Sequence, residues 1–498
     1  MAFQDMREFL EFLKNKNQLI EVDTELNAAR GTTELQPLMR HIHNINGPAL
    51  MLNNLSGYNH PDIPVLFNPY GTRERTSMIL GKERPLEGKL KFTEVLTNRS
   101  LWIKPNMIDR AEATCKQVII EKKDIDLSQQ LPHVWFGKEG PSYITNAVVI
   151  SKDPETGQLN TGCYRLTQLW NASHPLGEEY SEEEQKKCLA IFAFWNPPGN
   201  DIGRQWAKAQ EMNKPLELAI ACIVDPVVQI AAATSITYGE DEMDFAGGLR
   251  GEGVDVVQCE TVDLAVPATA EWVIEGTFLP ERDIAIGPHS NPVGYYDDAQ
   301  ILPLIEVDCI THRKDPIWYA TMEMEPPFDH NYMACMPLEG EVLSDLQTKI
   351  PEVQDVVVTP NLSYFVQLSV DGEQKPRADF GKEVLQAVWG ANGRWGPTAK
   401  LVVVVGPDVN PYDLSEIEWA IQTRVQPQTD TIINEAGQAF LMDPSAVKDP
   451  GHGIALVSEQ VGIDATIKIP ERFESYPKYS NAEPEDVIAI AEKLQGVL

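Results

Sequence analysis

The segments YITNAVVIS (143–151) and QLNTGCYRLTQLW (158–170) decide the fold that we predict for this chain. The first is an apolar, β-branched run typical of a half-buried strand. Between them, DPETG (153–157) has the composition of a turn, with an Asp-Pro opening and a glycine that can adopt a positive φ. We therefore predict a β-hairpin, and the rest of the chain can be ordered around it.

The second strand of this hairpin carries three residues that are unusual in a strand. Asn160 can offer a carbonyl oxygen to a cation, Gly162 allows a backbone to approach a ligand closely, and Arg165 brings a permanent charge. Strict alternation places Asn160 and Arg165 on opposite faces, so both can serve one site only if the strand bulges, and we expect the bulge at Gly162. The alternative is an edge hairpin with a solvated arginine.

Composition bounds the class of protein. A chain of 498 residues is too long for one ordinary core and suggests roughly two to four domains. A hydrophobic content of 43% and a charged content of 23% are typical of soluble globular proteins. The net charge of −33 argues against nucleic acid or an anionic membrane as the main partner.

Location can also be predicted from the sequence. No apolar run is long enough to span a bilayer, and the first residues lack a signal-peptide pattern. Seven cysteines are scattered without CxxC pairs, which argues against a disulfide framework or a structural zinc site. We therefore expect a cytoplasmic protein with free thiols.

The pattern of helix and strand signals divides the chain into three parts. Residues 1–120 alternate helical and strand signals and predict a small α/β domain. Residues 121–320 contain many strands with turns between them and predict a barrel-like sheet. Residues 321–498 alternate helix and strand again, so we expect a third, α/β domain whose helices could form a subunit interface. The fold class is therefore α/β (α+β).

A cluster of glycines near residue 250 has two interpretations. Gly247, Gly248, Gly251 and Gly253 fit neither the dinucleotide fingerprint nor the Walker pattern. Together with Arg250 they could hold a single phosphate through backbone N–H groups. We favour the simpler interpretation, a tight turn between a helix and a strand.

Four segments of the chain together resemble one known family. The most specific of them combines a characteristic glycine placement with a Val-Pro-Ala turn and an E-x-V-I-E-G strand. The segments are NTGCYR (160–165), EMDFAGGLRGEGVDVVQCETVDLAVPATAEWVIEG (242–276), VDCITHR (307–313) and VGPDVNPYDLSEIEWAIQTR (405–424). Over nearly its full length the chain resembles the UbiD family of reversible decarboxylases, which use prenylated FMN. The resemblance implies an N-terminal α/β domain, a central split β-barrel that holds the flavin, and a C-terminal α/β dimerisation domain.

The resemblance also implies two cation sites. Asn160 and Glu242 match residues that bind a divalent metal under the flavin phosphate, and Asp201 matches a position that is histidine in the family. A set of Asn, Asp and Glu ligands would suit Mg²⁺ or Mn²⁺, because all three side chains present oxygen. Residues 231–234 match a loop that gives backbone oxygens to a potassium ion.

Further residues match the family's flavin and substrate positions. Gly162, Cys163 and Tyr164 match positions that wrap the flavin, and Arg165 matches the arginine beside the isoalloxazine and the substrate carboxylate. Phe440, Leu441 and Met442 match the region of an apolar lid over the substrate. Ordinary core packing is the alternative for these three residues.

The chain departs from the family where relatives carry their proton-handling carboxylates. In the segment IGPHSNPVGYY (286–296), Ile286 and Asn291 occupy the two acidic positions, and neither side chain can transfer a proton. We expect His289 to replace them, because its pKa suits proton transfer near neutral pH. An exposed loop histidine is the alternative. Glu323 and His330 match substrate-side positions and are weaker candidates.

The function implied by the resemblance is reversible decarboxylation of an aromatic or α,β-unsaturated carboxylic acid, with CO₂ or bicarbonate as the second reactant. The expected partners are a flavin prenyltransferase, as supplier of the cofactor, and further copies of the chain in a homodimer or larger homo-oligomer. The alternative is a non-catalytic or specialised subunit of a larger carboxylase complex. A subunit that binds no cofactor has no chemical need for Asn160, Arg165 and Glu242 together.

Overall fold

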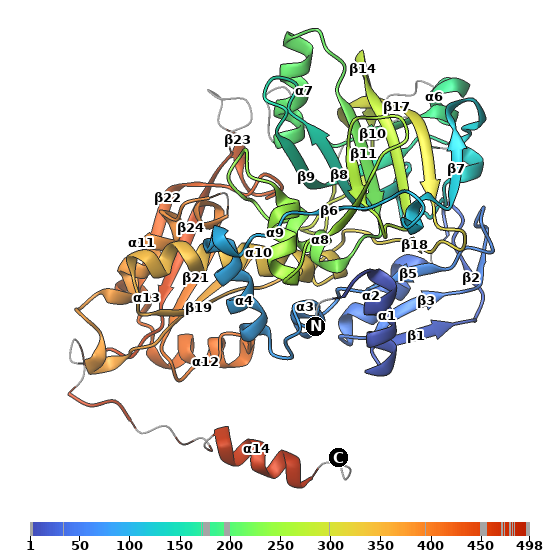
Figure 1. Ribbon diagram of the computed structural model, residues 1–498. Helices are drawn as coiled ribbons and strands as arrows, with labels where there is room; N and C mark the ends of the chain where they lie inside the picture. Colours follow the sequence, from blue (N-terminus) through green and yellow to red (C-terminus); the bar gives the residue numbers. More distant parts are fainter. Residues whose placement is uncertain are drawn as a thin grey trace.

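The computed structural model contains a strand-rich centre, an N-terminal α/β part and a C-terminal α/β part (Figure 1). The structure describes residues 3–448 and 456–494, apart from 33, 171, 173–179, 194–199, 298, 394, 470, 471, 473, 478, 479, 481 and 483. Among these residues, no helix is both long and apolar enough to cross a membrane.

The centre of the molecule is a closed barrel of six strands. These are β8 (Ser142–Lys152), β9 (Leu159–Gln168), β10 (Cys188–Ile191), β11 (Glu217–Cys222), β14 (Trp272–Ile286) and β17 (Gln300–His312). They run in the order β10-β9-β8-β11-β14-β17, and pairing of β10 with β17 closes the ring. A seventh strand, β7 (Val118–Glu121), pairs with β17 outside it. The predicted central β-barrel is confirmed.

The predicted hairpin is confirmed, but its bulge lies elsewhere than expected. Strands β8 and β9 pair antiparallel, and Gly162 faces Val149 in regular register. The register shifts between Ile144 and Ala147 on β8, so that two residues of β8 lie opposite Arg165. The prediction of a bulge at Gly162 was wrong. The solvated edge hairpin is also wrong, because β9 pairs on both sides and the Arg165 side chain is only 10% exposed.

The N-terminal part is a four-stranded sheet with helices packed against it. Its strands are β1 (Leu19–Val22), β3 (Ala49–Leu52), β5 (Val65–Phe67) and β18 (Trp318–Tyr319), in that order. Its first two helices are α1 (Met6–Asn15) and α2 (Leu35–Asn44). Helix α1 begins where the Asp5 side chain accepts the Glu8 N–H, and it buries its apolar face. Strand β18 returns to this sheet after the barrel, so the sheet joins distant parts of the chain.

The C-terminal part is an α/β sheet with a parallel centre. Its strands are β19 (Val353–Val358), β20 (Ser363–Leu368), β21 (Leu401–Val405), β24 (Leu456–Asp464) and β22 (Thr431–Gln438), in that order, with β23 (Val447–Lys448) beside β24. Its helices include α10 (Asp329–Lys349), α11 (Phe380–Trp389) and α12 (Leu414–Arg424). Strands β20, β21 and β24 are parallel, and apolar side chains cover both faces of β21, as predicted for a buried strand.

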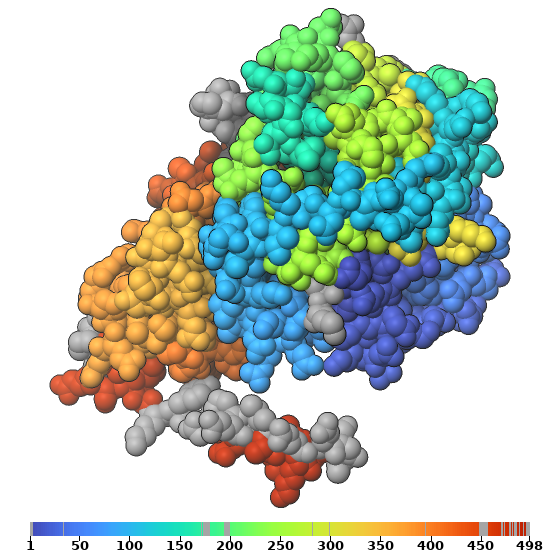
Figure 2. Space-filling model, viewed as in Figure 1, coloured from blue at the N-terminus to red at the C-terminus, as the bar shows by residue number. Residues whose placement is uncertain are grey.

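Two helices of the N-terminal region, α3 (Arg73–Ile79) and α4 (Pro85–Thr97), lie beside the C-terminal part. In Figure 2 the blue surface of this region lies next to the orange surface of the C-terminal part. Lys89 of α4 is fully buried there. Its Nζ lies 2.5 Å from Asp355 Oδ1 and 3.1 Å from Glu339 Oε2, both from the C-terminal part. Removal of either partner of this contact would leave a buried charge without compensation, so Lys89 couples the two regions.

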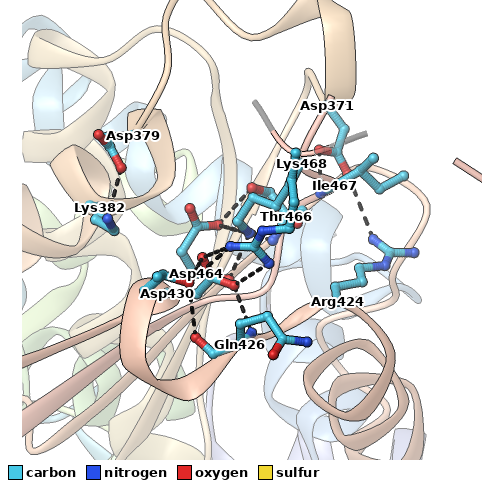
Figure 3. Close-up of polar contacts among 12 residues, drawn as sticks. Asp371, Asp379, Lys382, Arg424, Gln426, Asp430, Asp464, Thr466, Ile467 and Lys468 are labelled. Carbon is cyan, nitrogen blue, oxygen red and sulfur yellow. Dashed lines mark hydrogen bonds and ion pairs between the residues drawn. The ribbon is translucent and has the colours of Figure 1, made fainter. Parts of the chain in front are cut away.

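A polar cluster lies at the carboxyl ends of the parallel strands in the C-terminal part (Figure 3). Asp464, the last residue of β24, accepts the Thr466 hydroxyl at 2.6 Å and lies 3.2 Å from Lys468 Nζ. Arg424, the last residue of α12, lies 3.6 Å from Asp371 in the same cluster. These contacts fasten the chain that follows β24 to the edge of the sheet.

The glycine cluster ends a helix and allows close packing. Helix α9 (Glu242–Arg250) ends at Gly251, whose φ is +87°. A Cβ on Gly247 would lie 2.1 Å from the Ile103 carbonyl oxygen. Arg250 pairs with buried Asp225. The turn interpretation is therefore the one that the structure supports.

The remaining α-helices and β-strands of the described chain lie around these parts. They are β2 (Leu26–Asn27), β4 (Leu55–Ser56), β6 (Asn106–Met107), β12 (Asp255–Gln258), β13 (Ala265–Pro267), β15 (His289–Ser290), β16 (Tyr296–Asp297), α5 (Leu127–Gln130), α6 (Glu182–Lys187), α7 (Asp201–Glu211), α8 (Pro226–Ala232), α13 (Pro427–Asp430) and α14 (Pro484–Lys493).

Candidate active site

A cavity of about 220 Å³ brings together residues that are far apart in the sequence. The barrel, the short β15–β16 hairpin, the loop before α10 and the segment after β22 all contribute to its wall. The lining residues are Thr145, Cys163, Tyr164, Arg165, Phe192, Asn200, His289, Asn291, Gln300, Glu323, His330 and Met442. The mixture of aromatic, basic and acidic side chains is typical of a site that binds a small charged ligand.

Arg165 is the fixed positive charge of this cavity. One guanidinium nitrogen, Nη1, donates to the Ser290 carbonyl at 2.6 Å, and the other, Nη2, pairs with the Glu323 carboxylate. The guanidinium carbon lies 5.4 Å from the centre of the Tyr143 ring and 5.7 Å from that of Phe192. Contacts on both nitrogens and on two rings hold the guanidinium in one orientation.

Two buried carboxyl groups lie near Arg165. Glu323 lines the cavity, and its Oε1 lies 3.7 Å from His330 Nδ1. Glu139 lies behind the cavity wall and accepts the Ser290 hydroxyl at 2.6 Å. Burial raises the pKa of Glu139 to about 7, although the positive charge of Arg165 lowers it. Glu139 therefore has a proton affinity suited to exchange near neutral pH.

These two carboxyls lie outside the segment IGPHSNPVGYY (286–296), in which the resemblance led us to expect the acidic positions. Ile286 is fully buried in an apolar cluster at the barrel end and is not among the cavity residues. Asn291 lines the cavity. Glu323 and His330, the weaker candidates, reach the cavity, whereas Glu139 was missed because no motif marks it in its proline- and glycine-rich loop.

His289 is buried and faces the cavity rather than solvent. Its Nε2 lies 3.3 Å from Asp297 Oδ2, and its ring meets Phe192 edge to face at 4.9 Å. Asn291 Nδ2 donates to the other oxygen of Asp297 at 3.1 Å. Although burial opposes this, hydrogen bonds from His289 and Asn291 keep the pKa of Asp297 below its ordinary value. The arrangement orients the histidine through an ionised carboxylate.

The second ring nitrogen of His289 completes this geometry. Among the described residues, Nδ1 has no hydrogen-bond partner, and it is buried. With Nε2 directed at Asp297, Nδ1 is the nitrogen left to exchange a proton with a ligand. His289 therefore has the geometry of a proton-transfer group.

The predicted lid residues lie in three different environments. Met442 lines the cavity, whereas Phe440 lines a neighbouring cavity of about 260 Å³ together with Tyr295 and Trp395. Leu441 is 45% exposed. In this structure only Met442 contributes to the cavity that holds Arg165.

One buried acid, Glu242, contacts the backbone of strand β9 next to Asn160. Glu242, in the first turn of α9, is 7% exposed and accepts the Thr161 N–H at 2.9 Å. Burial, together with the neighbouring carboxylates of Asp241 and Asp201, raises its pKa to about 8, although the hydrogen bond from the Thr161 N–H lowers it. Asn160 lies on the same strand as Thr161. A divalent cation would offset this accumulation of negative charge, so the donor set fits Mg²⁺ or Mn²⁺.

The metal ligands would have to include Asn160. Among the described residues, no three His, Cys, Asp or Glu side chains converge on one point. Asp201 begins α7 and pairs with Arg204 at 3.3 Å. A cation bound here would therefore depend on the amide oxygen of Asn160, with water or phosphate oxygens completing its shell.

The predicted flavin-contacting segment is closely packed. A Cβ on Gly162 would lie 2.6 Å from the Tyr164 ring, so a larger residue here would force that ring to move. The Tyr164 hydroxyl lies 3.5 Å from Asn160 Nδ2 and accepts the Ile202 N–H at 3.3 Å. The Cys163 thiol contacts Gln229 of α8. Tyr164 thereby links the cavity to the oxygen cluster.

The predicted potassium loop, residues 231–234, begins inside a helix. Helix α8 extends through Ala232, and the Ala231 carbonyl accepts the Thr234 N–H at 3.0 Å. The expectation that all four residues form a loop was therefore wrong. The end of a helix still presents carbonyl oxygens of the kind that attract cations.

Comparison with known proteins gives three family matches along the chain. The 3-octaprenyl-4-hydroxybenzoate carboxy-lyase (UbiD) N-terminal domain matches residues 10–89, the Rift-related domain 106–326 and the C-terminal domain 331–465. An uncharacterized protein of Archaeoglobus fulgidus is 31% identical over 485 residues, which cover 94% of this chain and 92% of that protein.

Solved structures of two enzymes resemble the whole chain. The open form of vanillic acid decarboxylase from Sedimentibacter hydroxybenzoicus is 27% identical with a TM-score of 0.83, covering 100% of this chain and 99% of that chain. Its closed form gives a TM-score of 0.76 at the same identity and coverage. The UbiD-class enzyme HmfF from Pelotomaculum thermopropionicum, in complex with FMN, is 27% identical with a TM-score of 0.82 and covers 98% and 99% of the two chains. An evolved dimeric form of HmfF in complex with prFMN gives 0.76, at 27% identity and coverage of 97% and 100%.

Proposed function

Because the chain belongs to the UbiD family of carboxy-lyases, we propose that it is a prenylated-FMN-dependent enzyme that removes CO₂ from, or adds it to, an aromatic or α,β-unsaturated carboxylic acid. The observation that carries this proposal is the guanidinium of Arg165, fixed at a cavity between two aromatic rings. The flavin bound by HmfF and the aromatic acid named for the Sedimentibacter enzyme support it.

Bound prenylated FMN would supply the electron sink that loss of CO₂ requires. Gly162, Cys163, Tyr164 and Arg165 would contact it. Asn160, Glu242 and Asp201 would hold Mn²⁺ or Mg²⁺ next to its phosphate, and carbonyls of residues 231–234 would hold a potassium ion.

The remaining roles fall to side chains of the cavity. Arg165 would bind the substrate carboxylate and stabilise charge as it develops. Phe192 and Met442 would exclude water from the reacting carbon. His289, oriented by Asp297, would hold the proton that replaces CO₂ on that carbon and would deliver it from Nδ1.

Closure of the C-terminal part would complete the apolar wall. The higher TM-score against the open form of vanillic acid decarboxylase supports an open arrangement in this structure. We infer that Phe440 and Leu441 approach the cavity when the molecule closes, carried by the segment that already places Met442 there. Ile286 and Asn291 would then lie behind and beside the substrate, respectively.

The C-terminal part, residues 321–498, would also join copies of the chain into a homodimer or larger homo-oligomer. Helix α14 lies apart from the main body in Figure 1, and its Val487 and Ile490 are each 50% exposed. Residues 1–120 and 121–320 would form the N-terminal and flavin-binding domains. All seven cysteines are free thiols in the structure, which suits the predicted cytoplasmic location.

Cofactor analysis tests the proposed function. The protein should be co-expressed with a flavin prenyltransferase, the expected supplier of the cofactor, and the released cofactor identified by mass and absorbance spectrum. We expect prenylated FMN at near-stoichiometric occupancy and FMN alone without the prenyltransferase. A protein that binds neither flavin would instead be the non-catalytic subunit of a larger complex.

The proposed metal site predicts a loss of anchoring in two variants. Glu242→Gln and Asn160→Ala each remove an oxygen ligand, so metal affinity should fall by about 10–100-fold and flavin occupancy should fall with it. Metal content by mass spectrometry and flavin absorbance measure both effects. Glu155→Gln, at an exposed carboxylate, serves as the control. Full metal and flavin content in both variants would show that the cation assignment is wrong.

A further inference from the structure

Arg165 is already occupied by a carboxylate that belongs to the chain itself. Its Nη2 pairs with Glu323, and its Nη1 is taken by the Ser290 carbonyl. Arg165 is the only lysine or arginine among the residues that line the cavity in the described structure. A substrate carboxylate that approaches Arg165 must therefore compete with Glu323 for the same guanidinium.

The groups around Glu323 provide little positive charge to compensate a second anion. Arg165 approaches it from β9 and His330 from the start of α10. Glu139 lies behind Arg165, and Tyr143 packs against the guanidinium. His289 and its partner Asp297 complete the charged and titratable groups around the cavity.

The charge balance decides what binding does to Glu323. With Glu323 ionised, one guanidinium and one carboxylate form a neutral pair. Adding a substrate carboxylate would leave two anions for one cation in a buried site, which is costly unless one of them takes up a proton. Burial also lowers the pKa of His330, so this histidine is poorly suited to supply the missing positive charge.

We propose that Glu323 is a gate on the carboxylate-binding site: the substrate carboxylate displaces it from Arg165, and Glu323 takes up one proton as it leaves. The step forms one O–H bond on Glu323 with a proton from solvent, and no other bond changes. The inference rests on the proposed function in that the incoming ligand is a carboxylic acid. It makes Glu323 a positioning residue that sets the affinity of Arg165 for substrate and the dependence of that affinity on pH.

Benzoate binding to the flavin-loaded protein tests this gate without requiring turnover. Calorimetry in buffers of different ionisation enthalpy counts the protons taken up for each benzoate bound. We expect about one proton for the unmodified protein. The affinity should fall about tenfold for each pH unit over the range in which binding takes up one proton. Glu323→Gln should take up no proton and bind with an affinity independent of pH.

Glu139→Gln is the matched variant, because Glu139 is the other buried carboxyl near Arg165. We expect it to retain the proton uptake. Loss of uptake in Glu139→Gln but not in Glu323→Gln would assign the proton to Glu139 and overturn the gate. The gate would also be overturned if the unmodified protein took up no proton on binding benzoate, or if benzoate did not bind to it. Cofactor identity is measured separately, so failure of the gate is distinguishable from failure of the proposed function.

Discussion

Replacing Arg165 with lysine is expected to slow the exchange of labelled bicarbonate into the carboxyl group of a substrate acid by about 10²–10³-fold. A lysine retains the charge but not the planar fork, so it cannot reproduce the fixed directions in which the two guanidinium nitrogens of Arg165 reach the Ser290 carbonyl and a carboxylate. The ring contacts with Tyr143 and Phe192 that orient the guanidinium would also weaken. Isotope exchange measures this effect even when net turnover is slow.

Flavin content separates a chemical effect from a structural one in this experiment. We expect the lysine variant to retain its flavin, because the proposed phosphate anchor is formed by Asn160 and Glu242 rather than by Arg165. Arg110→Lys, at an exposed arginine that pairs with Glu260, should leave exchange unchanged. An undiminished exchange rate in Arg165→Lys would show that Arg165 serves only to pack the barrel.

The barrel could be predicted because its strands carry local signals. Apolar, β-branched runs and turn residues mark β8 and β9, and the structure has both. The position of the bulge could not be predicted. It depends on how β8 must curve to pair with both β9 and β11 in a closed ring, and nothing in the local sequence of Thr145 and Asn146 shows this.

The candidate site was only partly predictable for a related reason. Arg165 and His289 lie in segments that resemble a known family, so their proximity could be expected. Glu139 and Glu323 lie 26 residues before and 158 residues after Arg165, and only the folded chain brings them to it. The chain has 74 aspartate and glutamate residues, so the sequence alone does not mark these two as functional. Their burial around one guanidinium is what distinguishes them.

Asn291 contributes to the site although its amide has no acid chemistry. The sequence predicts only that it cannot transfer a proton. In the structure its amide donates to Asp297, the carboxylate that pairs with His289. Asn291 and His289, two residues earlier, therefore contact the same carboxylate and form one arrangement, which directs the final experiment to His289.

His289→Phe is expected to reduce the rate at which solvent deuterium enters the carbon that loses CO₂ by about 10²–10⁴-fold, the usual contribution of general acid catalysis. Phenylalanine resembles the imidazole in shape and can retain the edge-to-face contact with Phe192, so the fold and flavin binding should be preserved. Mass spectrometry of product formed in D₂O measures the incorporation. His41→Phe, at an exposed histidine of α2, is the control.

The result also decides between the two functions that the sequence allowed. A large loss in His289→Phe, with flavin content unchanged, would identify an enzyme that moves its proton through His289 and Asp297. Unchanged incorporation would remove His289 from the reaction and leave Glu323, which Arg165 already holds at the cavity wall, as the group to vary next. If Glu323→Gln also left incorporation unchanged, Glu139 and His330 would be the titratable side chains around Arg165 to vary next. The non-catalytic subunit would become the better explanation of this site only if the unmodified, flavin-loaded protein itself incorporated no deuterium into candidate acids.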